Sequence, residues 1–212
     1  MTEIDDVLVT RAGYDAVAEL YTNLVERQLD SNPFDRAMLD IFAALVAETE
    51  PGMVAEVGCG PGRVSAYLKA AGLNVFGIDL SPEMIRQAQA AHPDIRFEEG
   101  SMEQMSLDDA ALSGIVAWYS IIHTPPERVP TVLTEFARVL RPEGHVLFAF
   151  QAPEQAQGVE AFDHKVAPGY RWAPDTLAET LEETGFRVTA RMLRAPRPDD
   201  RGPQGYVLAV RN

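Results

Sequence analysis

Seven residues, Glu56 to Gly62, constrain this chain most, because they read Glu-Val-Gly-Cys-Gly-Pro-Gly. They follow a short apolar run, Met53 to Ala55, and precede a helix-like segment that begins at Arg63. Glycine has no Cβ and tolerates positive φ, so three alternate glycines let a ligand approach the bare backbone. The helix start behind them offers free N–H groups. The motif therefore predicts a strand, a tight turn and a helix around a nucleotide-like cofactor.

The spacing of the glycines distinguishes two classes of cofactor. The dinucleotide fingerprint is G-x-G-x-x-G, whereas this chain has G-x-G-x-G at Gly58, Gly60 and Gly62, with Glu56 two residues before the first glycine. A carboxylate there would repel a pyrophosphate, whereas an acidic side chain beside backbone N–H groups suits a ligand that carries an ammonium and a carboxylate. A plain turn is the alternative interpretation of a glycine triplet.

A second motif follows at the distance that such a site requires. Asn74 to Ile78 is an apolar strand that ends at Asp79, and Ser81 followed by Pro82 is typical of a helix start. An acidic residue at the end of the second strand, about 20 residues past the glycines, is placed to accept hydrogen bonds from ribose hydroxyls. The alternative is that Asp79 only caps a turn.

Together the two motifs resemble those of the class I S-adenosylmethionine (SAM)-dependent methyltransferases, over roughly residues 50–212. The resemblance implies SAM as the cofactor, S-adenosylhomocysteine (SAH) as its product, and methyl transfer by in-line displacement. It implies cofactor contacts from the glycine turn and its flanks, from the ends of the next strands, and from an N-terminal helix. These residues are Tyr14, Tyr21, Glu56, Gly58, Cys59, Gly60, Gly62, Asp79, Leu80, Ser101, Met102 and Trp118.

At the adenine end of the cofactor, the resemblance places Leu80 beside the ring and the Met102 N–H within reach of it. Relatives usually have Gly-Asp after the third strand, where this chain has Gly100-Ser101. The usual contact from that aspartate is therefore in doubt, and Glu103 is a candidate replacement. Cys59, inside the turn, is also interpreted as a small buried filler behind the cofactor.

Three aromatic positions and one histidine are assigned to the reacting end. Tyr14 and Tyr21 lie on one helical face, in a Tyr-Asp-x-x-Ala-x-x-Tyr string like those that open many small-molecule methyltransferases, although packing alone also explains them. Trp118 ends the fourth strand and would border the methionine part of SAM. His123 follows shortly after, where a neutral imidazole could take a proton from the acceptor. Its structural alternative is a hydrogen bond to a helix start.

From Met53 onward, strand-like and helix-like segments alternate, which is typical of a parallel sheet covered by helices. The last two strands are joined by a Pro/Asp/Gly loop without a helix, so they should form an antiparallel hairpin. The expected fold is the Rossmann-like class I methyltransferase fold, an α/β fold with a seven-stranded, mostly parallel sheet. Its expected strands are 53–57, 74–79, 95–98, 114–119, 144–150, 186–193 and 205–211, and its helices are 61–71, 82–91, 126–140 and 174–184.

Two further helices, at 14–29 and from Pro33 onward, precede the first strand. Residues 1–50 are therefore predicted to form an N-terminal helical cap on a SAM-binding core at 51–212, within a single domain. Residues 151–172 show no helical or strand periodicity, and we expect a lid or acceptor-binding segment there, or else a disordered excursion.

Composition excludes several classes of function. The net charge is -14, from 18 Lys+Arg and 32 Asp+Glu, without a basic run. Nucleic acid is therefore not expected as a partner, and a small neutral or cationic acceptor suits this field better. No apolar stretch is long enough for a membrane span, Cys59 is the single cysteine, and no Cys/His spacing suggests a metal. A cytoplasmic location is expected.

The sequence thus predicts a SAM-dependent methyltransferase that acts on a small molecule. It leaves open the acceptor, its reacting atom (O, N or C) and the oligomeric state. Three alternatives remain: another SAM-dependent displacement such as a cyclisation, an NAD(P)-dependent oxidoreductase, and a SAM-binding protein without catalysis.

Overall fold

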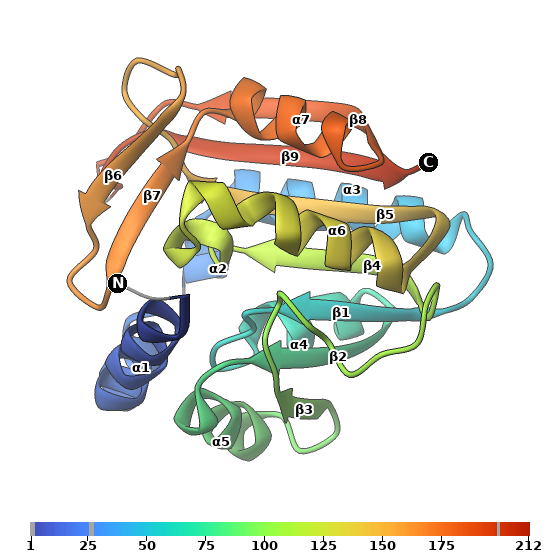
Figure 1. The fold of residues 1–212 in the computed structure, drawn as a ribbon. Helices are drawn as coiled ribbons and strands as arrows, with labels where there is room; N and C mark the ends of the chain where they lie inside the picture. The colour runs from blue at the N-terminus through green and yellow to red at the C-terminus, as the bar shows by residue number, and fades with distance from the viewer. Residues whose placement is uncertain (1–2, 26–27, 199) are drawn as a thin grey trace.

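A twisted sheet between two layers of helices forms the core of the computed structural model, which describes residues 3–25, 28–198 and 200–212 (Figure 1). The strand order is β3-β2-β1-β4-β5-β9-β8. Neighbours pair in parallel except at β9, which is antiparallel to both β5 and β8. The strands are β1 (Met53–Val57), β2 (Asn74–Asp79), β3 (Arg96–Glu99), β4 (Leu112–Trp118), β5 (Leu140–Gln151), β8 (Phe186–Arg194) and β9 (Gln204–Arg211).

The helices divide between the two faces of the sheet. In Figure 1, α6 and α7 lie in front of it and α3 and α4 lie behind, and the two faces pack as separate apolar clusters. The short helix α5 packs at the β2–β3 edge through a third cluster. The helices are α1 (Glu3–Val25), α2 (Gln28–Ser31), α3 (Pro33–Ala47), α4 (Arg63–Ala70), α5 (Pro82–Ala91), α6 (Val129–Val139) and α7 (Pro174–Glu183), with 3₁₀ turns η1 (Ile121–His123) and η2 (Pro126–Arg128).

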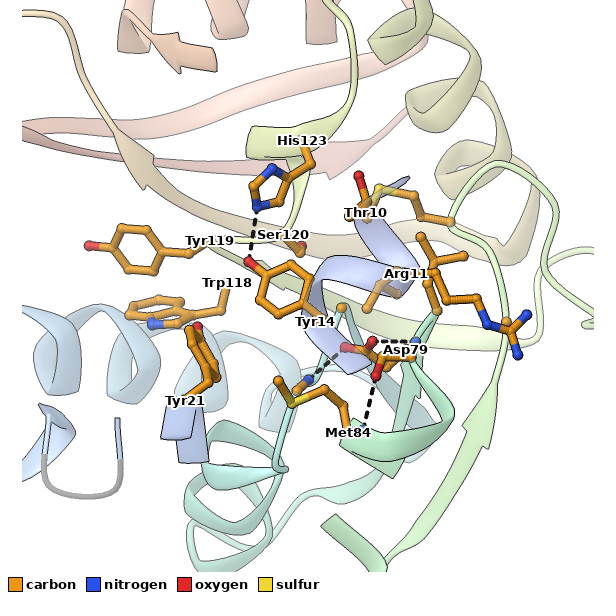
Figure 2. Close-up of a pocket in the computed structure, with 17 residues that line it drawn as sticks. Thr10, Arg11, Tyr14, Tyr21, Asp79, Met84, Trp118, Tyr119, Ser120 and His123 are labelled. Atoms are coloured by element: carbon orange, nitrogen blue, oxygen red, sulfur yellow. Dashed lines mark hydrogen bonds between the residues drawn. The ribbon is translucent and has the colours of Figure 1, made fainter. Parts of the chain in front are cut away.

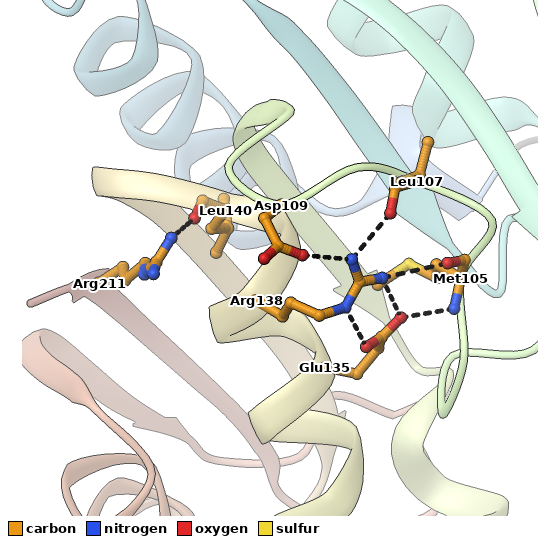
Figure 3. A network of polar contacts seen from close by, with 7 residues as sticks. All are labelled: Met105, Leu107, Asp109, Glu135, Arg138, Leu140 and Arg211. Carbon is orange, nitrogen blue, oxygen red and sulfur yellow. Dashed lines mark hydrogen bonds and ion pairs between the residues drawn. The ribbon is translucent and has the colours of Figure 1, made fainter.

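A polar network ties the β3–β4 connection to α6 (Figure 3). The Arg138 guanidinium donates to the carbonyls of Leu107 and Met105 at 2.8 and 3.1 Å, and to Asp109 at 2.8 Å. Glu135 accepts from Arg138 and from the Met105 N–H, at 2.7 and 2.6 Å. These bonds fix the connection that follows β3 to the C-terminal half of α6.

The predicted seven-stranded sheet with its antiparallel C-terminal hairpin is confirmed. Several boundaries differ: β5 begins at Leu140, not at 144, and the helix expected at 126–140 is divided into η2 and α6. The helix expected at 14–29 corresponds to two helices. Residues 14–25 belong to α1, which already begins at Glu3, and residues 28–29 belong to α2, while residues 26–27 lie outside the described part. The acidic residues before Tyr14 suit the first turn of a helix, which explains the earlier start.

The prediction that residues 151–172 lack strand structure was wrong. Two antiparallel strands, β6 (Val159–Asp163) and β7 (Pro168–Trp172), form a separate hairpin there. Pro168 is the first residue of β7, a position that needs no ladder N–H, so proline does not exclude a strand. Figure 1 shows this hairpin and α1 at the same end of the sheet, where β1, β2 and β4 finish.

Candidate active site

A pocket lies at the carboxyl ends of β1, β2 and β4, beneath α1 (Figure 2). Open α/β sheets bind ligands at this edge. Its walls come from α1, the glycine turn, the end of β2, and the segment after β4. The lining residues are Thr10, Arg11, Tyr14, Tyr21, Val57, Gly58, Gly60, Asp79, Leu80, Ser81, Met84, Gly100, Met102, Trp118, Tyr119, Ser120 and His123.

The glycine turn brings bare backbone to the pocket wall. Gly58 and Gly60 have φ of 74° and 51°, in the left-handed region that favours glycine. A Cβ on Gly58 would lie 2.2 Å from the Ser120 Cβ, so no side chain fits there. The Gly58 and Cys59 N–H groups donate to the Ile78 carbonyl at 2.7 and 3.0 Å, which joins the turn to the end of β2.

Asp79 braces this turn from the neighbouring strand. One carboxylate oxygen accepts the Gly60 N–H at 2.7 Å and the other accepts the Ser81 N–H at 2.9 Å (Figure 2). A carboxylate has about four acceptor positions, so Asp79 retains acceptor capacity for a ligand hydroxyl. Burial raises the pKa of Asp79, and hydrogen bonds from the backbone of Ser81, Gly60 and Leu80 oppose that rise.

Tyr14 and His123 form a hydrogen-bond chain across the pocket (Figure 2). The Tyr14 hydroxyl lies 2.9 Å from His123 Nε2. His123 Nδ1 lies 2.8 Å from the Pro168 carbonyl of β7, which the figure does not draw. A carbonyl can only accept, so Nδ1 carries the proton and Nε2 accepts from Tyr14. Burial lowers the pKa of His123 and raises that of Tyr14, so both groups are neutral at pH 7.

Further aromatic rings contact the Tyr14–His123 pair on both sides. The Tyr14 ring meets the Tyr21 ring edge to face at a centroid distance of 5.5 Å. On the other side, His164 of the β6–β7 turn meets the His123 ring at 4.8 Å. Burial, and the nearby His123 and Arg201, lower the pKa of His164 to about 4, so it stays uncharged beside His123 at neutral pH.

Comparison with known proteins agrees with this geometry. The family described as "Methyltransferase domain" matches residues 54–144. A malonyl-[acyl-carrier protein] O-methyltransferase of Pseudescherichia vulneris is 31% identical over 170 residues, which cover 78% of this chain and 67% of that protein. The chain belongs to the class I SAM-dependent methyltransferases.

Other relatives of the methyltransferase differ in what their names say they act on. A demethylmenaquinone methyltransferase of Chlorobaculum tepidum is 37% identical over 101 residues, 47% of this chain and 40% of that protein. Magnesium protoporphyrin IX methyltransferase of Synechocystis PCC 6803, solved with SAH, superposes with a TM-score of 0.75 at 19% identity, over 98% of this chain and 100% of that one. The 19% identity to the solved structure shows a shared fold, and the acceptors named for these two proteins differ.

SAM is the cofactor of this family, and two orphaned polar atoms of the methyltransferase support its fit. Trp118 Nε1 and Ser120 Oγ are buried and have no hydrogen-bond partner among the described residues, and both residues line the pocket. Buried polar groups without partners are costly. A polar ligand between the glycine turn and the end of β4 would satisfy them.

Four of the residues predicted to bind SAM do not line this pocket. Cys59 is buried behind the turn, and Gly62 forms the N-cap of α4. Ser101 lines an adjoining pocket. Glu56 is 2% exposed, and its carboxylate accepts from the backbone N–H and the hydroxyl of Ser65 in the first turn of α4, at 2.7 and 2.5 Å.

The adjoining pocket holds an ion-pair triad at the place where the usual aspartate is missing. Arg128 contacts Glu103 and, at 2.8 Å, Asp6 of α1. All three side chains are less than one-fifth exposed, with Arg128 at 14%. The triad carries two carboxylates and one guanidinium, so one negative charge is in excess beside Ser101.

Sequence reasoning missed Thr10, Arg11 and Met84 as lining residues. The available signal was helical spacing, because Thr10 lies one turn before Tyr14 on the same face of α1. Within the described residues, no group of three or more His, Cys, Asp or Glu side chains is arranged to hold a metal ion. Among those residues, too, no helix has the length and apolarity of a membrane span.

Proposed function

We propose that the methyltransferase methylates a small molecule whose nucleophilic atom carries a proton, and that Tyr14 and His123 remove that proton. The observation that carries the proposal is the directed hydrogen-bond chain from Tyr14 through His123 to the Pro168 carbonyl. Bound SAM supplies a methyl group that its sulfonium activates for displacement. The protein then has to position the acceptor, exclude water and accept one proton.

The proton path follows from the protonation states. The acceptor's proton passes to the Tyr14 oxygen as the Tyr14 hydroxyl proton passes to His123 Nε2. The tyrosine is thereby restored, and the imidazole becomes an imidazolium. That cation donates from Nδ1 to the Pro168 carbonyl, a bond that raises the pKa of His123 against the effect of burial. The pair accepts a proton without leaving a buried tyrosinate.

For the cofactor, we propose contacts with both halves of SAM. Asp79 accepts from the ribose hydroxyls with its remaining acceptor capacity. Leu80 and Met102 flank the adenine, and Glu103, held by Arg128, accepts from the adenine amino group in place of the missing aspartate. Trp118 lies at the methionine end, with its unpartnered indole N–H.

The acceptor is best described as neutral or cationic before reaction, since the chain carries a net charge of -14. A carboxylate acceptor is the second candidate, because one relative is named as an O-methyltransferase of a malonyl group. A carboxylate arrives deprotonated and needs no base, so the two candidates differ in their dependence on His123. Product analysis separates either from an intramolecular SAM-dependent cyclisation.

We also propose that residues 1–50 act as a helical cap that closes the pocket over residues 51–212. The placement of Tyr14 and Tyr21 on the pocket wall supports this. A cytoplasmic site of action is proposed from the single, buried cysteine, which has no possible disulfide partner within the chain.

The test is a screen of hydroxyl, amine and carboxylate acceptors, followed by kinetics of His123→Gln. With a hydroxyl acceptor, kcat should fall by roughly 10²–10⁴, the usual size of general-base assistance, while SAH affinity stays within about threefold. His92→Gln, at the C-terminal end of α5, is the matched control and should keep full activity.

The pH profile gives a second readout. The base must be neutral, so wild-type kcat should fall on acidification through an apparent pKa below the usual 6.5 of histidine and stay level above it. The variant should lack that step. A His123→Gln protein that turns over a hydroxyl acceptor at the wild-type rate, with the same profile, would leave no base role for His123.

A further inference from the structure

Gly13 stands in the middle of α1, where alanine is the better helix former. A glycine inside a helix commonly marks a close approach by another segment. Here that segment is the turn of the β6–β7 hairpin: a Cβ on Gly13 would lie 2.5 Å from the Val166 carbonyl oxygen and 3.0 Å from Val166 Cγ1. The nearest atom belongs to the backbone, so no side-chain rotation relieves the contact.

The same turn carries the group that orients His123. Pro168 is two residues beyond Val166, and its carbonyl accepts from His123 Nδ1 at 2.8 Å. His164, two residues before Val166, meets the His123 ring at 4.8 Å. How closely the turn packs against α1 therefore also determines where the Pro168 carbonyl and the His164 ring lie relative to His123.

We propose that Gly13 is a positioning residue: its missing side chain lets the hairpin turn seat deeply enough for the Pro168 carbonyl to fix the tautomer of His123. A Cβ at position 13 pushes the Val166 carbonyl outward and lengthens the Pro168 hydrogen bond two residues away. Without that acceptor, the Nε2–H tautomer of His123 becomes populated, and it cannot accept from Tyr14. The consequence for turnover rests on the proposed base role of His123, whereas the consequence for the tautomer does not.

The experiment compares wild type, Gly13→Ala and Gly13→Val, with and without SAH. Imidazole ¹⁵N spectra report the His123 tautomer, and amide hydrogen exchange reports the 164–168 turn. We expect His123 to be Nδ1-protonated in wild type, to become a mixture in Gly13→Ala, and to shift further in Gly13→Val. Exchange of the turn should rise at least threefold, and the SAH dissociation constant should change by less than threefold.

Ala16→Gly is the matched control, because it makes the reverse exchange on the same helix at an exposed position. It should leave the His123 tautomer and the exchange of the turn as in wild type. Gly13→Ala favours the helix, so it remains folded for the comparison if Gly13→Val does not. A wild-type tautomer and wild-type exchange in Gly13→Ala would overturn the proposal.

Failure of the proposed function gives a different result. If His123 is no base, Gly13→Ala still shifts the tautomer and the exchange, but turnover in both Gly13→Ala and His123→Gln stays at the wild-type level. If only the Gly13 proposal fails, His123→Gln loses turnover, and Gly13→Ala changes neither the spectra nor the rate.

Discussion

The buried carboxyl of Glu56 should make the stability of the methyltransferase depend on pH near neutrality. Burial raises the pKa of Glu56 from 4.5 to about 7, against the opposing effect of the Ser65 hydrogen bonds. Folding therefore favours the protonated form. Below pH 4.5 both folded and unfolded states hold the proton. Between 4.5 and about 7 the unfolded state loses it first, so the free energy of unfolding falls as pH rises and then levels off.

The size of this effect follows from the shift, at 1.36 kcal/mol per pKa unit. A rise of about 2.5 units corresponds to about 3 kcal/mol between pH 4.5 and 8. In Glu56→Gln that slope should be absent. The amide keeps an acceptor for Ser65 but buries an N–H₂ group without a designed partner, at a cost of about 1–3 kcal/mol. The variant should be the less stable protein at pH 5 and close to wild type at pH 8.

Urea unfolding of both proteins at several pH values measures this difference, and groups common to both cancel in it. Parallel stability curves from pH 5 to 8 would refute the reasoning. Repeating the series with SAH also tests the predicted role of Glu56 in cofactor binding. An ammonium near the carboxylate would lower the pKa of Glu56, and calorimetry in buffers of different ionisation enthalpy would detect proton release on binding.

Other expectations can be checked with the same protein. Asp79→Ala should weaken SAH binding at least tenfold by calorimetry, because charge-assisted bonds contribute about 1.5–3 kcal/mol each; Asp94→Ala, at an exposed ion pair, should not. Tyr206→Phe should lower the free energy of unfolding by about 1–3 kcal/mol, since it leaves the buried Asp35 carboxyl without its 2.5 Å donor. Tyr67→Phe, which loses an exposed bond of the same kind, should cost less than about 1 kcal/mol. Amide exchange in α1 and the β6–β7 hairpin should slow when SAH binds, and equal protection in both states would make them static walls.

Local sequence signals were sufficient to predict the sheet and about half of the residues that line the pocket. The Ser81 hydroxyl accepts the Met84 N–H at 3.1 Å, as the Ser-Pro-Glu helix start predicted. Gly58, Gly60 and Asp79 meet because parallel strands end at one edge, so two motifs about 20 residues apart in sequence suffice to bring them together. Here the order of the strands in the sheet determines which residues become neighbours.

The remainder depends on contacts that no local pattern encodes. The tautomer of His123 is set by the carbonyl of Pro168, 45 residues away, and any residue type at position 168 offers a carbonyl. The hairpin was missed because residues 151–172 show no strand periodicity, and its two strands pair only with each other, outside the main sheet. Glu56 was assigned to the cofactor by motif, but its carboxylate contacts Ser65, a partner available only once α4 has packed on β1.

The place of β9 in the sheet has a consequence for biosynthesis. It is inserted between β5 and β8, both of which leave the ribosome earlier. Until β9 arrives, β5 presents an unpaired edge along a strand whose second half, from Val146 to Phe150, is fully buried in the finished fold. Unpaired apolar edges recruit strands from other chains. A nascent chain stalled within the Pro/Asp/Gly loop before β9 should therefore be an aggregation-prone intermediate and a client for chaperones, although its five parallel strands can already be paired.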